Sequence, residues 1–112
     1  MAELLVEGGE VAAGPSDALG RLGTALSDPI RQTILRRLTM GPAFPSELAD
    51  LIDTSRSNLS NHLACLRGCG LVVAEREGRN LRYELVSRRL GDALSAMEDA
   101  VVDAATAATP HD

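Results

Sequence analysis

The sequence predicts a small, mainly α-helical domain with one β-hairpin. Apolar residues recur at helical spacing through most of the chain, and a β-branched segment followed by an alternating one lies between residues 71 and 86. Glycine, proline and small capping residues separate these segments. The 112 residues suit a single domain, and hydrophobic residues, at 45%, are numerous enough to fill one core.

The first expected helix begins where a capping residue precedes an apolar stripe. Ser16 or Asp17 can accept hydrogen bonds from the first turn, and the helix should end near Ser27. Its buried stripe is expected to consist of Leu19, Leu22 and Leu26. Residues 1–15 are rich in Glu, Gly and Ala, and we expect them to form a flexible N-terminal arm.

Three further helices are expected in the next forty or so residues. One has Asp28 as its cap and Pro29 in its first turn, and it stops at Gly41. A short helix opens at Pro45, and a turn at Asp53 separates it from the third; this is the helix-turn-helix layout. The stripes expected to be buried are Ile30, Ile34, Leu35 and Leu38 in the first of these helices and Leu48, Leu51 and Ile52 in the short one.

The helix expected from about Ser55 to Gly68 has two different faces. Its apolar side consists of Leu59, Leu63 and Leu66, and at 100° per residue the opposite side carries Ser57, Asn61, Ala64 and Gly68. A small, polar outer face can enter the major groove of DNA and form hydrogen bonds with base edges. The residues expected to contact DNA from this helix are Arg56, Ser57, Asn58, Ser60 and Asn61.

A β-hairpin is expected after this helix. The run from Leu71 to Glu77 is rich in β-branched residues, residues 77–80 form a turn, and the second strand places Leu81, Tyr83 and Leu85 on one face. Arginines at positions 76, 79 and 82 suit a wing that contacts phosphates or the minor groove. We expect Arg79 and Arg82 to contact DNA, and Arg31 and Arg67 are further candidates for phosphate contacts.

A last helix is expected from Ser87 to about Ala105. Its apolar residues, spaced four, three and four apart, are Leu90, Leu94, Met97 and Val101. This period is typical of two helices that pair, so we expect a homodimer formed through the terminal helices. The winged helix-turn-helix domain would then span residues 16–105, and residues 106–112 would be a flexible tail.

The charge of the chain is unevenly distributed. The net charge is −5, yet residues 31–89 hold ten arginines against six acidic residues, and the acidic excess lies at both ends. The basic centre favours a nucleic-acid partner despite the negative total. The sequence has no signal-peptide pattern and no apolar run of membrane-spanning length, so we expect a cytoplasmic protein with no membrane partner.

Both cysteines, Cys65 and Cys69, lie near the end of the predicted DNA-reading helix. Residues four apart on a helix share a face, with about 5–6 Å between their Cβ atoms. In a reducing compartment thiols are expected in place of a disulfide, and two thiolates at this distance can hold one soft metal ion. The alternative is that they are small buried hydrophobic residues. His62, on the same flank, is either a structural histidine or a further ligand.

Four segments, DPIRQTILRRL, SELAD, SNLSNHLACLRGCGLV and EGRNLRYEL, resemble the ArsR/SmtB family of metal-responsive transcriptional repressors. The resemblance covers about residues 17–105 and is strongest to the cadmium- and lead-sensing members. It implies a homodimeric repressor that holds operator DNA when metal-free and releases it when Cd²⁺ or Pb²⁺ binds Cys65 and Cys69. Zn²⁺ is a further candidate. Such sensors take a third cysteine from the partner's C-terminal tail; this chain has none, and His111 falls near that position.

Two other functions stay open. A thiol-based regulator that responds to oxidation or arsenite would use the same two cysteines, whereas a winged-helix DNA-binding protein without a metal response would not use them. No constellation of carboxylate, serine and histidine converges on a pocket, so we expect neither an enzyme nor a small-molecule substrate.

Overall fold

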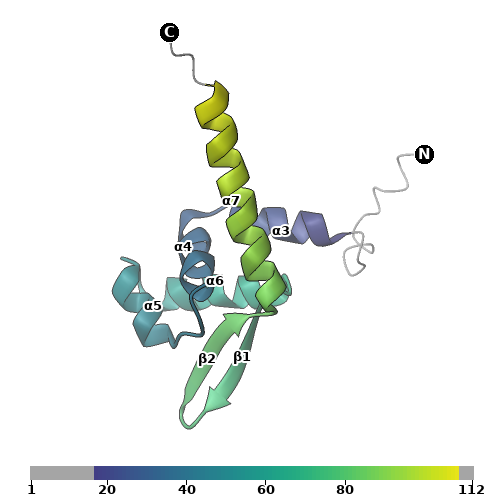
Figure 1. Cartoon of the computed structure of the whole chain (residues 1–112). Coiled ribbons are helices and arrows are strands. Elements are labelled where there is room, and N and C mark those ends of the chain that lie inside the picture. Colours follow the sequence, from purple (N-terminus) through teal and green to yellow (C-terminus); the bar gives the residue numbers. More distant parts are fainter. Residues whose placement is uncertain (1–16, 109–112) are drawn as a thin grey trace, which may run out of the picture.

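The computed structural model describes residues 17–108 as a set of helices around a β-hairpin (Figure 1). The elements are α3 (Ala18–Leu26), α4 (Pro29–Leu38), α5 (Pro45–Leu51), α6 (Arg56–Gly68), β1 (Val72–Glu77), β2 (Asn80–Leu85) and α7 (Arg88–Ala108). This order confirms the predicted mainly α-helical fold with a small hairpin. The expectations for the N-terminal arm, for Ser16 and for His111 fall outside the described residues.

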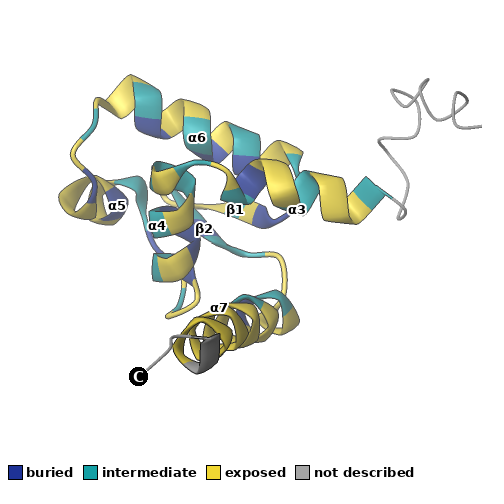
Figure 2. Ribbon diagram, turned by 90° about the horizontal axis from the view of Figure 1, so that it is seen from above, coloured by how far each residue is buried: buried dark blue, intermediate teal, exposed yellow. Residues whose placement is uncertain are grey.

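The core lies where α4, α5 and α6 meet the inner face of the hairpin (Figure 2). Its fully buried large side chains are Ile34, Leu35, Leu48 and Leu66. Burying one such side chain stabilises the fold by about 1.5–3 kcal/mol. In the stripes predicted for α4 and α6, Ile34, Leu35, Leu38, Leu59, Leu63 and Leu66 are buried as expected, whereas Ile30 is only partly buried against the core.

Two leucines predicted to be buried are exposed, and for them the prediction is wrong. Leu51 is 57% exposed because α5 has only seven residues and packs on the core through Leu48 and the following Ile52. Leu19 is 78% exposed because the first turn of α3 extends beyond the core, which α3 reaches at Ala25. In the remaining part of the stripe, Leu22 and Leu26 pack against the core as expected.

Local capping contacts fix where the helices begin. The carboxylate of Asp28 accepts hydrogen bonds from the backbone N–H groups of Ile30 at 2.8 Å and Arg31 at 3.2 Å. The hydroxyl of Ser55 accepts one from the N–H of Asn58 at 3.0 Å. The Asp28 cap confirms the prediction, and Ser55 lies where the third of these helices was expected to begin. Asp17 does occupy the cap position of α3, but its side chain makes no capping hydrogen bond.

Gly70 determines where α6 ends. Its φ angle is +80°, which side chains disfavour, and its N–H donates to the carbonyl of Arg67 at 3.0 Å. The N–H of Leu71 donates to the carbonyl of Leu66 at 3.1 Å, so the two bonds complete a Schellman motif. Cys69 is therefore the last residue before a fixed reversal of the chain.

The hairpin is antiparallel, with a register that runs from Val72 opposite Leu85 to Glu77 opposite Asn80. Gly78, at φ +66°, begins its two-residue turn. The sequence did not predict that Ala43 extends this sheet: its backbone N–H and C=O bond to Tyr83 at 2.9 and 2.8 Å. This bridge fixes the hairpin to the loop between α4 and α5.

Helix α7 begins after the hairpin and extends away from the core (Figure 1). It ends at Ala108 instead of near Ala105, so residues 106–108 are helical and not part of a tail. The physical reason is composition, since Thr106 is followed by two alanines, which favour helix, and Pro110 comes only later. None of the helices within residues 17–108 is long and apolar enough to cross a membrane.

We expect the substitution Ser55→Ala to lower the free energy of unfolding by about 1 kcal/mol, because the N–H of Asn58 loses its partner at the start of α6. Ser55→Thr retains an acceptor and should remain close to wild type. Denaturant titration followed by circular dichroism measures both variants. Equal stability of the alanine variant and the wild type would contradict this role.

Candidate nucleic-acid interface and thiol site

The first half of α6 presents a polar outer face. Arg56, Ser57, Ser60 and Asn61 are exposed, as the helical periodicity predicts. Asn58 differs from them, because its side-chain amide donates to the hydroxyl of Thr54 at 2.8 Å and is half-buried. Asn58 therefore stabilises the turn before α6, and the other four side chains are the ones that face outward.

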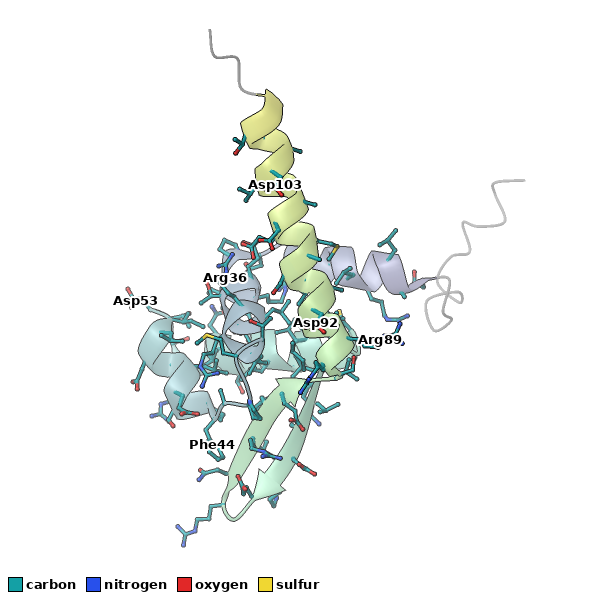
Figure 3. The ribbon with its side chains drawn as sticks, viewed as in Figure 1. Arg36, Phe44, Asp53, Arg89, Asp92 and Asp103 are labelled. Atoms are coloured by element: carbon teal, nitrogen blue, oxygen red, sulfur yellow. The ribbon has the colours of Figure 1, made fainter. Side chains whose placement is uncertain are left out.

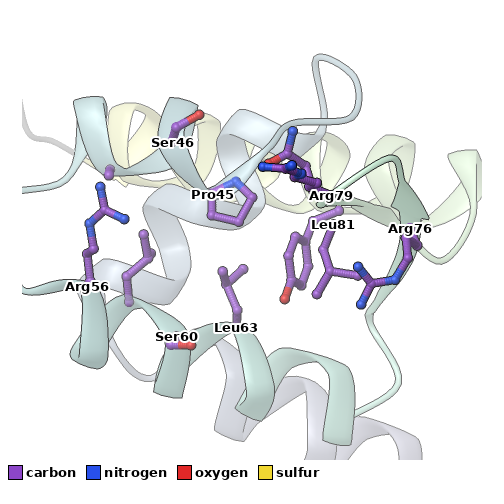
Figure 4. A pocket seen from close by; sticks show the side chains of 12 residues that line it. Pro45, Ser46, Arg56, Ser60, Leu63, Arg76, Arg79 and Leu81 are labelled. Atoms are coloured by element: carbon purple, nitrogen blue, oxygen red, sulfur yellow. The ribbon is translucent and has the colours of Figure 1, made fainter.

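A hollow of about 450 Å³ lies between α5, α6 and the hairpin (Figure 4). Arginines line it from different elements: Arg56 from α6, Arg76 from β1 and Arg79 from the hairpin turn. Its apolar lining consists mainly of Leu59, Leu63, Leu81 and Tyr83. None of the described residues that line it is acidic. Guanidinium groups that line one hollow suit an anion, and phosphate in particular.

The arginines of the hairpin lie on different faces. Arg82 pairs with Glu75 across the ladder, and its Nη2 donates to the Glu75 carboxylate at 2.8 Å. Arg76 pairs with Leu81 instead and therefore shares the face that lines the hollow. Arg76 was not among the expected DNA contacts. The sequence could have indicated this position, because residues an even number apart on a strand share a face and Arg76 is four residues from the buried Val72.

Cys65 and Cys69 lie on successive turns at the end of α6, where both are free thiols and half-buried. Burial raises the pKa of Cys69, and the charge of Cys65 and a hydrogen bond with its side chain raise it further. The charges of Arg31 and Arg21 oppose this effect. Cys69 is therefore a protonated thiol at neutral pH, and a metal ion must displace its proton to bind.

The described residues provide two sulfur ligands and no complete metal site. Within residues 17–108 no three His, Cys, Asp or Glu side chains lie close enough together to hold a metal ion. His62, one turn before Cys65, is directed elsewhere: its Nδ1 lies 3.1 Å from Nη1 of Arg31 and 3.8 Å from Oδ2 of Asp28. The thiol pair fits a soft ion in donor type and spacing but needs a ligand from another segment.

Arg31 contributes to the fold and not to the outer surface. Its Nη2 donates to the carbonyl of Thr24 at 2.8 Å and to the hydroxyl of Ser27 at 3.2 Å, and its Nε donates to the carbonyl of Ala25 at 3.2 Å. These bonds satisfy the last carbonyls of α3. The suggestion that Arg31 binds phosphate is therefore not supported, whereas Arg67 is exposed.

Apolar side chains remain exposed on α7. Met97, Val101 and Val102 are 41%, 68% and 58% exposed. A hollow of about 440 Å³ lies between α4 and α7, with Leu26, Leu35, Leu94, Met97 and Val101 among its lining residues. At its edge Arg36 donates to Glu98 at 2.6 Å and joins the two helices (Figure 3). An apolar surface of this kind is typical of a protein interface.

Residues 28–73 match the family model described as "Bacterial regulatory protein, arsR family". The chain is 52% identical over 85 residues to the HTH-type transcriptional regulator CmtR of Mycobacterium tuberculosis, and the alignment covers 76% of this chain and 72% of CmtR. Both findings concern regulators of transcription and not enzymes.

Solved structures agree in fold. The chain is similar to the NMR structure of the cadmium metal-sensor CMTR from Mycobacterium tuberculosis, with 53% identity and a TM-score of 0.59 over 69% of this chain and 80% of that one. It is also similar to the homodimeric winged helix-turn-helix DNA-binding domain of Mb0332 from Mycobacterium bovis, a possible ArsR-family regulator. That structure has 28% identity and a TM-score of 0.72 over 86% of this chain and 88% of its own.

Proposed function

Because this chain belongs to the arsR family of bacterial regulatory proteins, we propose that it is a metal-responsive transcriptional repressor. It binds operator DNA as a homodimer and releases it when a soft divalent metal binds at Cys65 and Cys69. One observation carries the proposal: α6 bears the thiol pair at its C-terminal end and the exposed Ser57 and Asn61 in its first half. The same rigid helix is thus both the reader of DNA and the holder of the ligand.

The DNA side of the proposal rests on α6 and the arginine-lined hollow. Two copies of α6 would enter successive major grooves about 34 Å apart. We propose that the exposed Ser57, Ser60 and Asn61 meet base edges and that Arg56 and Arg79, which line the hollow, meet phosphates. Arg82 reaches DNA only if it gives up its bond to Glu75. A DNA-bound regulator of this kind acts in the cytoplasm.

The metal side rests on the donor atoms. Thiolates prefer soft ions, which supports Cd²⁺ and Pb²⁺ as inducers and leaves Zn²⁺ as a further candidate. The similarity to a protein described as a cadmium sensor supports Cd²⁺. Cys65 and Cys69 would supply two ligands, and we propose His111, on the tail of the partner subunit in a homodimer, as a further one.

The release mechanism follows from the way Cys69 is held. Cys69 caps α6 and precedes the reversal at Gly70, so its sulfur cannot move far without moving the end of the helix. When Cys65 and Cys69 are drawn toward another segment, α6 shifts and its outer face leaves register with the bases. Coupling of this kind is typically about 1–3 kcal/mol and is reciprocal, so DNA must weaken metal binding by the same factor.

The apolar surface of α7 supports a homodimer. Met97, Val101 and Val102 are exposed in the single chain, and Leu19 of α3 is exposed as well. A second copy would cover such residues and bring the C-terminal segment of one subunit toward the partner. A homodimer also suits a pseudo-palindromic operator.

The central test measures binding of the protein to the DNA upstream of its own gene by fluorescence anisotropy. Adding Cd²⁺ should weaken binding roughly 5- to 150-fold. Without added metal, the double variant Cys65→Ser, Cys69→Ser should bind the DNA with the affinity of the wild type. Adding Cd²⁺ should not change that affinity. A double variant that still responds would place the metal site elsewhere. A response to arsenite or an oxidant without a response to Cd²⁺ would favour the thiol-based alternative.

We expect Arg76→Gln to weaken binding to specific and unrelated duplexes by a similar factor, because Arg76 faces the hollow and reads no base. The slope of log affinity against log salt should fall by about 1. Arg82→Gln removes the same charge from the opposite face of the hairpin and is the matched control. The assignment is wrong if the control loses affinity and Arg76→Gln does not.

We expect Val101→Glu to raise the dimer dissociation constant by roughly 100-fold or more, since each interface would gain two unpaired carboxylates. Sedimentation equilibrium measures the change. Met40→Glu, on the exposed loop after α4, introduces the same charge beside the first turns of α7 and not beside Val101, and should leave the dimer intact. A Val101→Glu protein that remains dimeric would exclude this surface as the interface.

A further inference from the structure

Arg31 joins the end of α3 to the flank of α6 that carries the thiols. Its Nη2 and Nε bond to the carbonyls of Thr24 and Ala25, and its Nη1 lies 3.1 Å from Nδ1 of His62. His62 precedes Cys65 by three residues and Cys69 by seven, so these side chains follow one another along the same flank. The guanidinium thus links a neighbouring helix to the thiol flank.

A second bond holds the same two helices together at the end of α6. Nε of Arg21, on α3, donates to the backbone carbonyl of Cys69 at 3.1 Å. Helix α3 therefore bonds directly to the last turn of α6 and, through Arg31, to the middle of α6. The two ties lie on either side of Cys65.

The contact with Arg31 specifies the state of His62. Arginine has only donors, so Nδ1 of His62 is the acceptor in this contact. The carboxylate of Asp28, 3.8 Å from the same Nδ1, is also an acceptor and already receives the N–H groups of Ile30 and Arg31. The His62 side chain is only 15% exposed, so water competes weakly for this bond.

The position of His62 along α6 suggests what the contact does. A helix rises about 1.5 Å per residue, so His62 lies near the middle of the 13-residue helix, between Ser57 at one end and Cys69 at the other. A helix held at its middle converts a displacement at one end into a displacement at the other. Without that hold, the last turn can move while the DNA-facing end stays in place.

We propose that Arg31 is a positioning residue that couples the Cys65 and Cys69 pair to the DNA-facing end of α6 by holding His62. The proposal rests on the proposed function and names how that function is regulated. It also gives His62 a role other than metal ligand. Arg31 touches neither DNA nor metal and acts only through His62.

The experiment compares the affinity for the upstream DNA with and without Cd²⁺ and uses the ratio of the two dissociation constants as the readout. His62→Leu removes the acceptor but leaves the bonds between Arg31 and α3, and the ratio should fall about tenfold toward 1. Arg31→Met should give the same fall. His62→Asn places an amide oxygen near the position of Nδ1 and should restore most of the wild-type ratio.

Arg37→Met is the matched control, because Arg37 lies on the same helix and donates only to the nearby Gly41 carbonyl at 3.0 Å among the bonds described. Its ratio should equal that of the wild type. Nitrogen NMR of the metal-free protein gives an independent readout: Nδ1 of His62 should be unprotonated and Nε2 protonated, and this tautomer preference should be lost in Arg31→Met.

The outcomes separate the two proposals. A wild-type protein whose DNA affinity ignores Cd²⁺ overturns the proposed function and the coupling with it. If the wild type responds to Cd²⁺ and the variants His62→Leu and Arg31→Met keep the same ratio of dissociation constants, only the role of Arg31 is overturned. Direct bonding of Cd²⁺ to the His62 ring, seen in nitrogen NMR of the Cd²⁺-bound protein, would identify His62 as a ligand and also overturn that role.

Discussion

Burial of the leucine row of α6 is the constraint on which the rest of the molecule depends. Leu59, Leu63 and Leu66 pack into the core and fix the rotation of the helix about its axis. Every other side chain of α6 then has a determined direction: Ser57 and Asn61 face outward, and the flank with Cys65 and Cys69 faces α3. A rotation of one residue, 100°, would bury polar groups and expose the leucines. The leucine row thus separates the outward polar face of α6 from its thiol flank.

The sequence predicts the elements whose boundaries depend on local chemistry. Asp28 with Pro29 and Ser55 begin helices through contacts two or three residues away, so their positions follow from the sequence alone. Contacts between distant residues could not be predicted in this way. The bridge from Ala43 to Tyr83 and the contact of Arg31 with His62 depend on how helices pack, and a periodicity does not encode packing partners. The face of the hairpin on which Arg76 lies could have been inferred from the sequence, because side chains alternate between the two faces along a strand.

Charge on this protein acts through local placement and not through the total. The net charge is −5, yet the hollow beside α6 is lined by Arg56, Arg76 and Arg79 with no acidic residue among the described ones. Glu75 compensates Arg82 on the opposite face of the hairpin. Charges within about 10 Å, the screening length at moderate salt, are only partly screened, so these guanidinium groups would attract a phosphate at the hollow. The face of the hairpin toward the hollow can thus attract an anion, whereas on the opposite face the charge of Arg82 is compensated.

The incompleteness of the thiol pair suits the proposed metal switch. A ligand shifts an equilibrium between two conformations only by its difference in affinity for them. Cys65 and Cys69 are one turn apart on a regular helix and offer the same two sulfurs whether or not α6 is in register with DNA. A site completed within α6 would bind metal equally well in both states and would not release DNA. In the proposed mechanism a further ligand from another segment would create the difference, provided that only one position of α6 brought it within reach of both sulfurs.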